Sequence, residues 1–263
     1  MPEPTVFPEL NEVLGELVRS VREVLGDKFR GAYLQGSFAV GDADEHSDVD
    51  FVIVTNDEVT AAEEAALQAM HARLYALESP WAQHLEGSYI PKSRLRRVDP
   101  RREPFLYLDN GATELIRDNH DNTAVVRWSL REHGVVLAGP DPKSLVDPVS
   151  AEGLSRNVLE SMDEWESWLA ERDEGMSRRL QGLLVLSYCR MLHTLATGRV
   201  TSKREAGEWA LGALDPEWAE LIQRALDDRP DPWRKVHEPA DPEAAERSLA
   251  FMAYARSSSS ADC

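Results

Sequence analysis

Apolar residues in the first part of the chain recur with two different periods. From Glu9 to Leu25 they return every three or four positions, the spacing of a helix that buries one face. Shorter apolar runs farther on are rich in β-branched and aromatic residues, which is typical of strands. Thr60-x-x-Glu63 is a capping-box pattern that begins a second helix. The expected elements are helices at 9–25 and 60–77 and strands at 30–35, 51–55 and 84–90, which together predict a small α/β unit.

Helical spacing governs the second half of the chain. Pro, Arg and Gly interrupt residues 91–111, which predicts a long loop or an irregular hairpin, and residues 139–148 have the composition of a linker. We therefore expect two domains, residues 1–149 and an all-α domain at 150–263, with a polar tail without regular structure from about residue 257. The expected helices lie at 122–137, 154–171, 178–197, 203–213, 216–227 and 242–255.

The charge of the chain narrows the choice of ligand. With 47 acidic and 29 basic residues the net charge is −18, which repels a nucleic-acid backbone unless the protein has a local basic groove, and which attracts cationic small molecules. Solubility alone is the alternative explanation of this charge. A basic run between residues 92 and 102 lacks the interleaved aromatic residues of a single-strand binder, so it indicates a solvated loop. We expect a small cationic substrate, no nucleic-acid partner and a monomer.

Three features of the composition point to a cytoplasmic protein. No apolar stretch is long enough to cross a bilayer, so no membrane partner is expected. The first residues lack the basic and apolar regions of a signal peptide. The two cysteines, Cys189 and Cys263, make no disulfide framework, which is consistent with a reducing compartment.

The densest cluster of candidate chemistry is residues 36–54, GSFAVGDADEHSDVDFVIV. Strand side chains alternate between faces, so Asp48 and Asp50 should point the same way at the start of an apolar strand. Two carboxylates aimed at one point repel each other unless a cation lies between them. Mg²⁺ takes one or two carboxylates together with substrate phosphates. The sequence therefore predicts a magnesium site where this strand begins.

Gly36 and Ser37 precede the strand and are candidates for contact with phosphate. A residue without a Cβ lets backbone N–H groups approach phosphate oxygens, and the Ser37 hydroxyl adds a donor. Ser47 is a second candidate donor. A Gly-Ser pair or an Asp-x-Asp pair alone is usually an ordinary turn, and it is the combination that indicates a nucleotide site.

At these residues the chain resembles a known superfamily. The segments GSFAVG (36–41) and SDVD (47–50) look like the signature of the nucleotidyltransferases that share their fold with DNA polymerase β. Within that superfamily the chain resembles the streptomycin/spectinomycin-type aminoglycoside adenylyltransferases, through LREHGVVLAGP (130–140) and LATGRVTSKREAGEWA (195–210). The resemblance implies an α+β fold: a polymerase β-like nucleotidyltransferase domain with a small mixed sheet, followed by an α-helical substrate-binding domain.

The resemblance also implies a reaction and its residues. ATP would be the co-substrate, and two Mg²⁺ ions held by Asp48 and Asp50 would orient attack by a substrate hydroxyl on the α-phosphorus, with loss of pyrophosphate. Glu86 matches the family's third carboxylate, which acts as general base, as a metal ligand or as both. Glu78, just outside the strand, is the alternative to Glu86.

Two basic residues of the helical domain match nucleotide-binding positions of the family. Ser202-x-x-Glu205 is a capping-box pattern that places Lys203 in a first helical turn, where a cation is unfavourable unless an anion binds there. The resemblance implies that Lys203 and Arg190 contact nucleotide phosphates. An ordinary buried ion pair is the alternative interpretation of Arg190.

The acceptor pocket follows the family less closely. Trp168 and Asp173 match the tryptophan and aspartate that streptomycin-modifying relatives place over the drug, where an aromatic face and a carboxylate suit a polycation. Trp165 and Trp168 are also at helical spacing, so both could instead pack on the core. The family's substrate-stacking tryptophan has no counterpart in FLYLDN (105–110), where Tyr107 is the nearest aromatic residue.

Three functions remain open on the sequence. The leading hypothesis is Mg²⁺-dependent transfer of AMP from ATP to a hydroxyl of an aminoglycoside or aminocyclitol antibiotic. The same chemistry could act on a protein side chain or on another small molecule. A non-catalytic nucleotide-binding module is the third, although a degenerate site would be expected to lose some of its signature residues.

Overall fold

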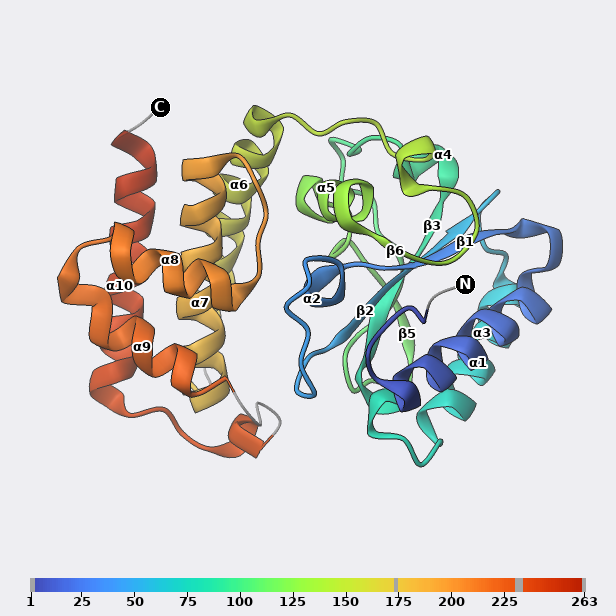
Figure 1. Ribbon diagram of the computed structural model, residues 1–263, viewed down its shortest axis with the longest axis horizontal. Helices are drawn as coiled ribbons and strands as arrows, with labels where there is room; N and C mark the ends of the chain where they lie inside the picture. The colour runs from blue at the N-terminus through green and yellow to red at the C-terminus, as the bar shows by residue number, and fades with distance from the viewer. Residues whose placement is uncertain (1–2, 173–174, 230–233, 262–263) are drawn as a thin grey trace. The chain divides into compact units, whose positions relative to one another are not determined.

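The structure is a computed structural model that describes residues 3–172, 175–229 and 234–261. By its internal contacts the chain divides into two compact units, Met1–Val149 and Ser150–Cys263 (Figure 1). The first unit has an α+β fold and the second is helical, which confirms the expected fold class. No helix in the described parts of the chain combines the length and the apolar character needed to span a membrane.

The first unit is built on a mixed sheet. Its described strands have the order β5-β4-β3-β2-β1-β6, in which β2 and β3 are parallel and every other neighbouring pair is antiparallel. The strands are β1 (Phe29–Leu34), β2 (Val49–Thr55), β3 (Leu85–Pro91), β4 (Phe105–Leu108), β5 (Leu115–Asp118) and β6 (Val135–Ala138). The helices and 3-10 turns are α1 (Pro8–Leu25), η1 (Gly26–Lys28), α2 (Gly36–Ala39), α3 (Ala61–Tyr75), η2 (Pro80–His84), α4 (Lys92–Leu95), α5 (Ala124–His133) and η3 (Pro142–Ser144).

Strand β2 lies between two apolar cores. Phe51 and Ile53 pack with α1 and α3 on one face of the sheet, whereas Val52 and Val54 pack with α5 on the other. All four side chains are fully buried. This is why β2 is a continuous apolar run rather than an alternating one: a central strand covered on both faces has no side for water. Asp50, which follows Val49 at the beginning of β2, is the polar residue in this run, and it lies on the face of the sheet that α5 covers.

Two parts of the sheet differ from the sequence-based expectation. Residues 91–111, expected as a loop or hairpin, contain α4 and strand β4, which forms a hairpin with β5. The helix expected at 122–137 ends earlier, because α5 stops at His133 and residues 135–138 pair with β1 as an edge strand. A short apolar run such as Val-Val-Leu-Ala fits either helix or strand, and the open edge of β1 decides between them.

The second unit is a bundle around one buried helix. The helix α7 packs against α6, α8, α9 and α10, and its apolar residues form the centre of the core. Cys189 lies on α7 fully buried, and burial raises the pKa of its thiol to about 12. The elements of this second unit are α6 (Ala151–Ala170), α7 (Arg178–Thr197), α8 (Lys203–Ala213), η4 (Pro216–Trp218), α9 (Ala219–Asp227), η5 (Arg234–His237) and α10 (Pro242–Ala261).

The C-terminal segment corrects the expectation of an irregular tail from residue 257. Helix α10 continues to Ala261. Its serines are accommodated because their hydroxyls donate to carbonyl oxygens of the preceding turn: Ser258 to Tyr254 at 2.9 Å and Ser259 to Ala255 at 2.7 Å. A polar composition therefore did not mean irregular structure here, since the hydroxyls of Ser257, Ser258 and Ser259 are satisfied within the helix itself.

A buried histidine gives the first unit a pH-dependent stability. His71 of α3 is 2% exposed, its Nε2 lies 2.7 Å from the Tyr89 hydroxyl, and its Nδ1 has no hydrogen-bond partner among the described residues. Burial lowers the pKa of His71 to about 3. In the unfolded chain the His71 side chain takes up a proton near the ordinary histidine pKa of about 6.5. Because the folded state does not take up that proton until the pH is much lower, it loses stability relative to the unfolded state as the pH falls below about 6.5.

We expect this histidine to steepen the acid limb of the stability curve. Between pH 6 and pH 4, the free energy of unfolding of the native protein should fall relative to His71→Gln by about 1.4 kcal/mol for each pH unit. Urea denaturation at several pH values measures the difference. His133→Gln, at an exposed histidine of the same unit, is the control and should keep the native slope. Equal slopes for the native protein and His71→Gln would contradict the prediction.

Candidate functional site

Three carboxylates lie at the edge of the sheet where β2 and β3 begin. Because the two strands are parallel, their first residues meet at the same edge, and the register pairs Asp50 directly with Glu86. Paired residues of neighbouring strands project from the same face, which here is the α5 face. Asp48 lies just before β2, two residues from Asp50. The structure thus brings together three residues that the sequence analysis had assigned to one site.

Gly36 makes room for the Asp50 carboxylate. It begins α2 with φ of +59°, in the left-handed region, and a Cβ at this position would overlap the Asp50 side chain. The backbone N–H of Gln35 also donates to the Asp50 carbonyl oxygen at 2.9 Å, which ties this segment to β2. Both the backbone angle and the close approach require glycine.

The Ser37 hydroxyl is buried beside this segment and has no hydrogen-bond partner among the described residues. Buried polar atoms are nearly always paired, so an unpaired one calls for a ligand or water. Ser47 differs: its hydroxyl donates to Asp44 Oδ1 at 3.1 Å and accepts from the Asp44 N–H at 3.0 Å. The Ser47 hydroxyl proton is therefore already used in shaping the loop before β2.

Asp48 is held by the turn between β4 and β5. The Asn110 side-chain Nδ2 donates to Asp48 Oδ1 at 2.7 Å, and the Asn110 side-chain oxygen, Oδ1, lies 3.3 Å from Nδ1 of His84. Sequence analysis did not identify Asn110, because nothing in the spacing of residues 105–111 shows that this turn folds back over the start of β2. Its asparagine amide is the kind of neutral donor that steadies a carboxylate without neutralising it.

The Glu86 side chain is largely buried, with 14% of its surface exposed. The Tyr107 hydroxyl donates to Glu86 Oε1 at 2.6 Å, and His120 Nε2 lies 3.4 Å from the same oxygen. Burial raises the pKa of Glu86 to about 7, although His120 and the Tyr107 hydrogen bond act in the opposite direction. A carboxylate with a pKa near neutrality is suited to accept and release a proton.

A fourth carboxylate, Asp121, lies behind the site and was not predicted from the sequence. It is 2% exposed, and its Oδ1 accepts from the Gln35 side-chain amide at 3.2 Å. Burial raises the pKa of Asp121. Gln35 directly precedes Gly36, so this hydrogen bond joins the loop before α5 to the segment that carries Gly36 and Ser37. Asp121 therefore contributes to the frame of the site rather than to its open side.

The donor set fits Mg²⁺ as far as this chain's own residues go. Asp48 and Asp50 offer hard carboxylate oxygens, Gly36 gives the Asp50 carboxylate the room that it occupies, and Ser37, the next residue, has a buried hydroxyl without a partner among the described residues. In the described part of the chain no group of three or more His, Cys, Asp or Glu side chains is arranged to hold a metal. In proteins Mg²⁺ is usually held by one or two carboxylates, with substrate phosphates and water completing its ligands.

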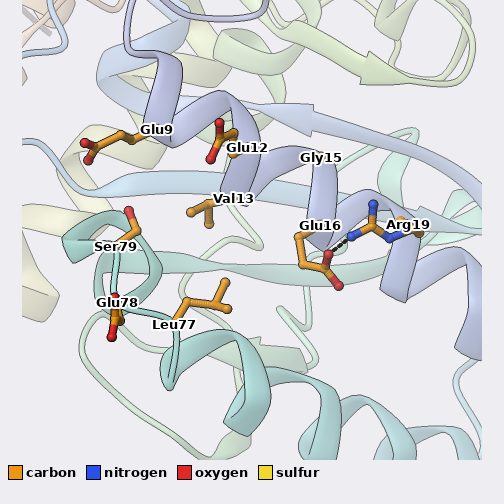
Figure 2. A pocket seen from close by; sticks show the side chains of 9 residues that line it. All are labelled: Glu9, Glu12, Val13, Gly15, Glu16, Arg19, Leu77, Glu78 and Ser79. Carbon is orange, nitrogen blue, oxygen red and sulfur yellow. Dashed lines mark ion pairs between the residues drawn. The ribbon is translucent and has the colours of Figure 1, made fainter.

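The alternative base Glu78 lies elsewhere. It lines a hollow of about 790 Å³ between α1 and residues 77–79, together with Glu9, Glu12 and Glu16 (Figure 2). Glu16 forms an ion pair with Arg19 there. This hollow belongs to the helical face of α1, and it contains neither Asp48, Asp50 nor Glu86. Glu86, paired with Asp50, is the better candidate for the base.

The second unit carries the remaining predicted residues. Lys203 is the first residue of α8, as predicted, and the Ser202 hydroxyl before it accepts a hydrogen bond from the Glu205 N–H at 3.0 Å. Arg190 lies on α7 and is half-buried. Trp168 of α6 is 43% exposed, whereas Trp165 packs against the helical core. The Arg172 guanidinium lies 4.7 Å from the centre of the Trp168 ring. Asp173 lies outside the described residues.

Comparisons with known proteins agree on both units. Residues 18–100 match the nucleotidyltransferase domain family, and residues 144–253 match the family described as aminoglycoside adenylyltransferase, C-terminal domain. A spectinomycin 9-adenylyltransferase of Staphylococcus aureus is 27% identical, covering 80% of this chain and 81% of its own length. An aminoglycoside (3'') (9) adenylyltransferase of Escherichia coli is 25% identical, covering 84% and 85%.

A solved structure shares the fold. The crystal structure of the spectinomycin adenyltransferase AAD(9) from Enterococcus faecialis with ATP and spectinomycin has a TM-score of 0.73 and 15% identity. The match covers 94% of this chain and 98% of that one. The two chains share one fold, and the expected polymerase β-like domain followed by a helical domain is confirmed.

The space beside Asp50 can be tested with a matched pair of variants. Gly36→Ala should weaken binding of a magnesium complex of a non-hydrolysable ATP analogue by at least about tenfold, which is about 1.4 kcal/mol, because the new methyl group displaces the Asp50 carboxylate. Isothermal titration calorimetry measures the affinity.

Gly41→Ala is the control for this measurement. Gly41 has φ of +77°, and a Cβ there meets nothing within 4 Å, so this variant reproduces the backbone strain of about 1–2 kcal/mol without the overlap. It should bind the nucleotide like the native protein. Equal loss of affinity in both variants would show that backbone strain, not the space beside Asp50, accounts for the effect.

Proposed function

Because the chain belongs to the aminoglycoside adenylyltransferase family and is an enzyme of the nucleotidyltransferase type, we propose that it transfers AMP from ATP to a hydroxyl of an aminoglycoside or aminocyclitol antibiotic, with release of pyrophosphate. Streptomycin and spectinomycin are the first acceptors to consider. The observation that carries the proposal is the pairing of Asp50 with Glu86 at one edge of the sheet, with Asp48 beside them.

Each carboxylate has a distinct part in this reaction. Asp48 and Asp50 would hold Mg²⁺, which when bound neutralises the triphosphate and favours departure of pyrophosphate. Gly36 and Ser37 would contact phosphate oxygens, with the unpaired Ser37 hydroxyl as donor. Ser47 could join them only by giving up its hydrogen bond to Asp44.

Glu86 would accept the proton of the acceptor hydroxyl. As that O–H bond breaks, the oxygen forms a bond to the α-phosphorus, and the bond to pyrophosphate breaks with its electron pair leaving on pyrophosphate. The raised pKa of Glu86 makes it a competent base near neutral pH, provided that the acceptor lies within hydrogen-bond reach. Lys203 and Arg190 would add positive charge to the nucleotide phosphates, as the family resemblance implies.

Two observations support the proposed binding of a cationic acceptor: the net charge of the chain and one exposed aromatic ring. A net charge of −18 favours a polycationic substrate. Trp168 already has a guanidinium over its face, which supports this ring as a surface for a cation, and Asp173 would supply a carboxylate to the same substrate. We propose a monomeric, cytoplasmic enzyme, since its co-substrate ATP is a cytoplasmic metabolite.

The reaction itself is tested by release of pyrophosphate. Purified protein with Mg²⁺ and each of the four NTPs in turn should release pyrophosphate with ATP in the presence of streptomycin or spectinomycin. Asp50→Asn should lower the rate by more than about a hundredfold, because a neutral amide cannot hold the cation. Asp57→Asn, in the exposed bend that follows β2, is the matched control and should keep the native rate. Turnover retained in Asp50→Asn would refute the proposed metal site.

The acceptor assignment has its own variant. Trp168→Ala should raise the KM for streptomycin at least about fivefold with little change in kcat, because the ring contributes binding energy and touches no reacting atom. Leu249→Ala removes an equally exposed apolar side chain from α10 and should leave KM unchanged. An unaltered KM in Trp168→Ala would place the acceptor elsewhere on the protein.

A further inference from the structure

We infer that Tyr107 is a positioning residue, whose hydroxyl holds the Glu86 carboxylate so that one of its oxygens faces the acceptor hydroxyl. The inference deepens the proposed function and rests on it. It concerns the segment where this chain lacks the family's substrate-stacking tryptophan, and it assigns that segment to the base rather than to the substrate.

The first support is the direction of the Tyr107 hydrogen bond. Its hydroxyl lies 2.6 Å from Glu86 Oε1 and 3.2 Å from Asp109 Oδ1, and it has one proton to give. Asp109 Oδ1 also accepts the Asn110 N–H at 3.0 Å, and the hydrogen bond from Tyr107 to Glu86 is the shorter of the two that its hydroxyl can make.

The second support is that Tyr107 is itself held in place. It lies on β4, a strand whose side chains are all buried, and it is 3% exposed. The register pairs Tyr107 of β4 with Ser88 of β3. Glu86 lies two residues before Ser88 and so shares its face, which means that the Tyr107 and Glu86 side chains project from the same face of the sheet. The His120 ring stacks on the tyrosine ring with centroids 5.4 Å apart and an angle of 28° between planes. A donor fixed in this way restricts the carboxylate it contacts.

The third support is the division of the two Glu86 oxygens. Tyr107 and His120 both approach Oε1. Among the described residues Oε2 of Glu86 accepts no hydrogen bond, which leaves that oxygen for the acceptor proton. Tyr107 cannot also stack on the substrate, because its ring is buried and one face is covered by His120. Tyr107 therefore contributes by orienting Glu86. A displacement of a reacting group by about 1 Å can lower the rate of reaction by about a hundredfold.

Steady-state kinetics separate this role from a structural one. Tyr107→Phe keeps the ring, its burial and its stacking, and removes only the donor. We expect kcat to fall about tenfold to a hundredfold, while the KM values for ATP and for the acceptor change by less than about twofold. Tyr89→Phe is the matched control, because Tyr89 is another buried tyrosine of the same sheet whose hydroxyl pairs with a side chain, His71, away from the site. It should keep the native kcat.

Crystal structures of the native protein and of Tyr107→Phe give a readout that does not depend on activity. Glu86 should occupy one side-chain conformation in the native protein and should rotate or become multiply placed in Tyr107→Phe. An unchanged Glu86 conformation, or a native kcat in Tyr107→Phe, would overturn the inference. If the native protein transfers AMP to no acceptor, the proposed function fails, and the two crystal structures still decide whether Tyr107 positions Glu86.

Discussion

Parallel pairing of β2 with β3 is the constraint on which the candidate site depends. It is the one parallel pair among the described strands, and it places the beginnings of two strands at the same edge with Asp50 opposite Glu86. Side chains alternate faces along a strand, so a slip of one residue would send one carboxylate into the core beneath α1 and α3. The buried residues that follow on β2 prevent that slip, because both of their faces are already filled.

The cost of gathering carboxylates at this edge is offset by neutral donors. Burial of unpaired charge is unfavourable, and each buried acid here receives a hydrogen bond from a side chain that carries no charge: Tyr107 for Glu86, Asn110 for Asp48 and Gln35 for Asp121. Neutral donors orient the acids without placing a positive charge against them. For the magnesium site proposed above this arrangement is favourable, since an arginine or lysine partner would compete with the cation for the carboxylates.

The two units contribute in different ways. The first supplies a rigid sheet edge, where reacting groups can be placed to a fraction of an ångström by strand register and by buried hydrogen bonds. The second is a bundle around α7 that leaves Trp168 and its neighbours on the surface of α6. Chemistry on the rigid unit and acceptor recognition on exposed helix positions would let the acceptor change among relatives without altering the reaction.

The sequence alone determined the features that depend on local spacing: the helix α1, the apolar strand β2 with its leading aspartates, the capped start of α8, and the Gly36-Ser37 segment. These are set by residues a few positions apart, so periodicity and turn chemistry reveal them. Only the tertiary structure decided the β4–β5 hairpin, the strand β6 and the partners of the carboxylates. Tyr107 contacts a residue 21 positions away, and Asn110 and Asp121 contact residues 62 and 86 positions away. Such contacts follow from strand order and register, which no local pattern encodes.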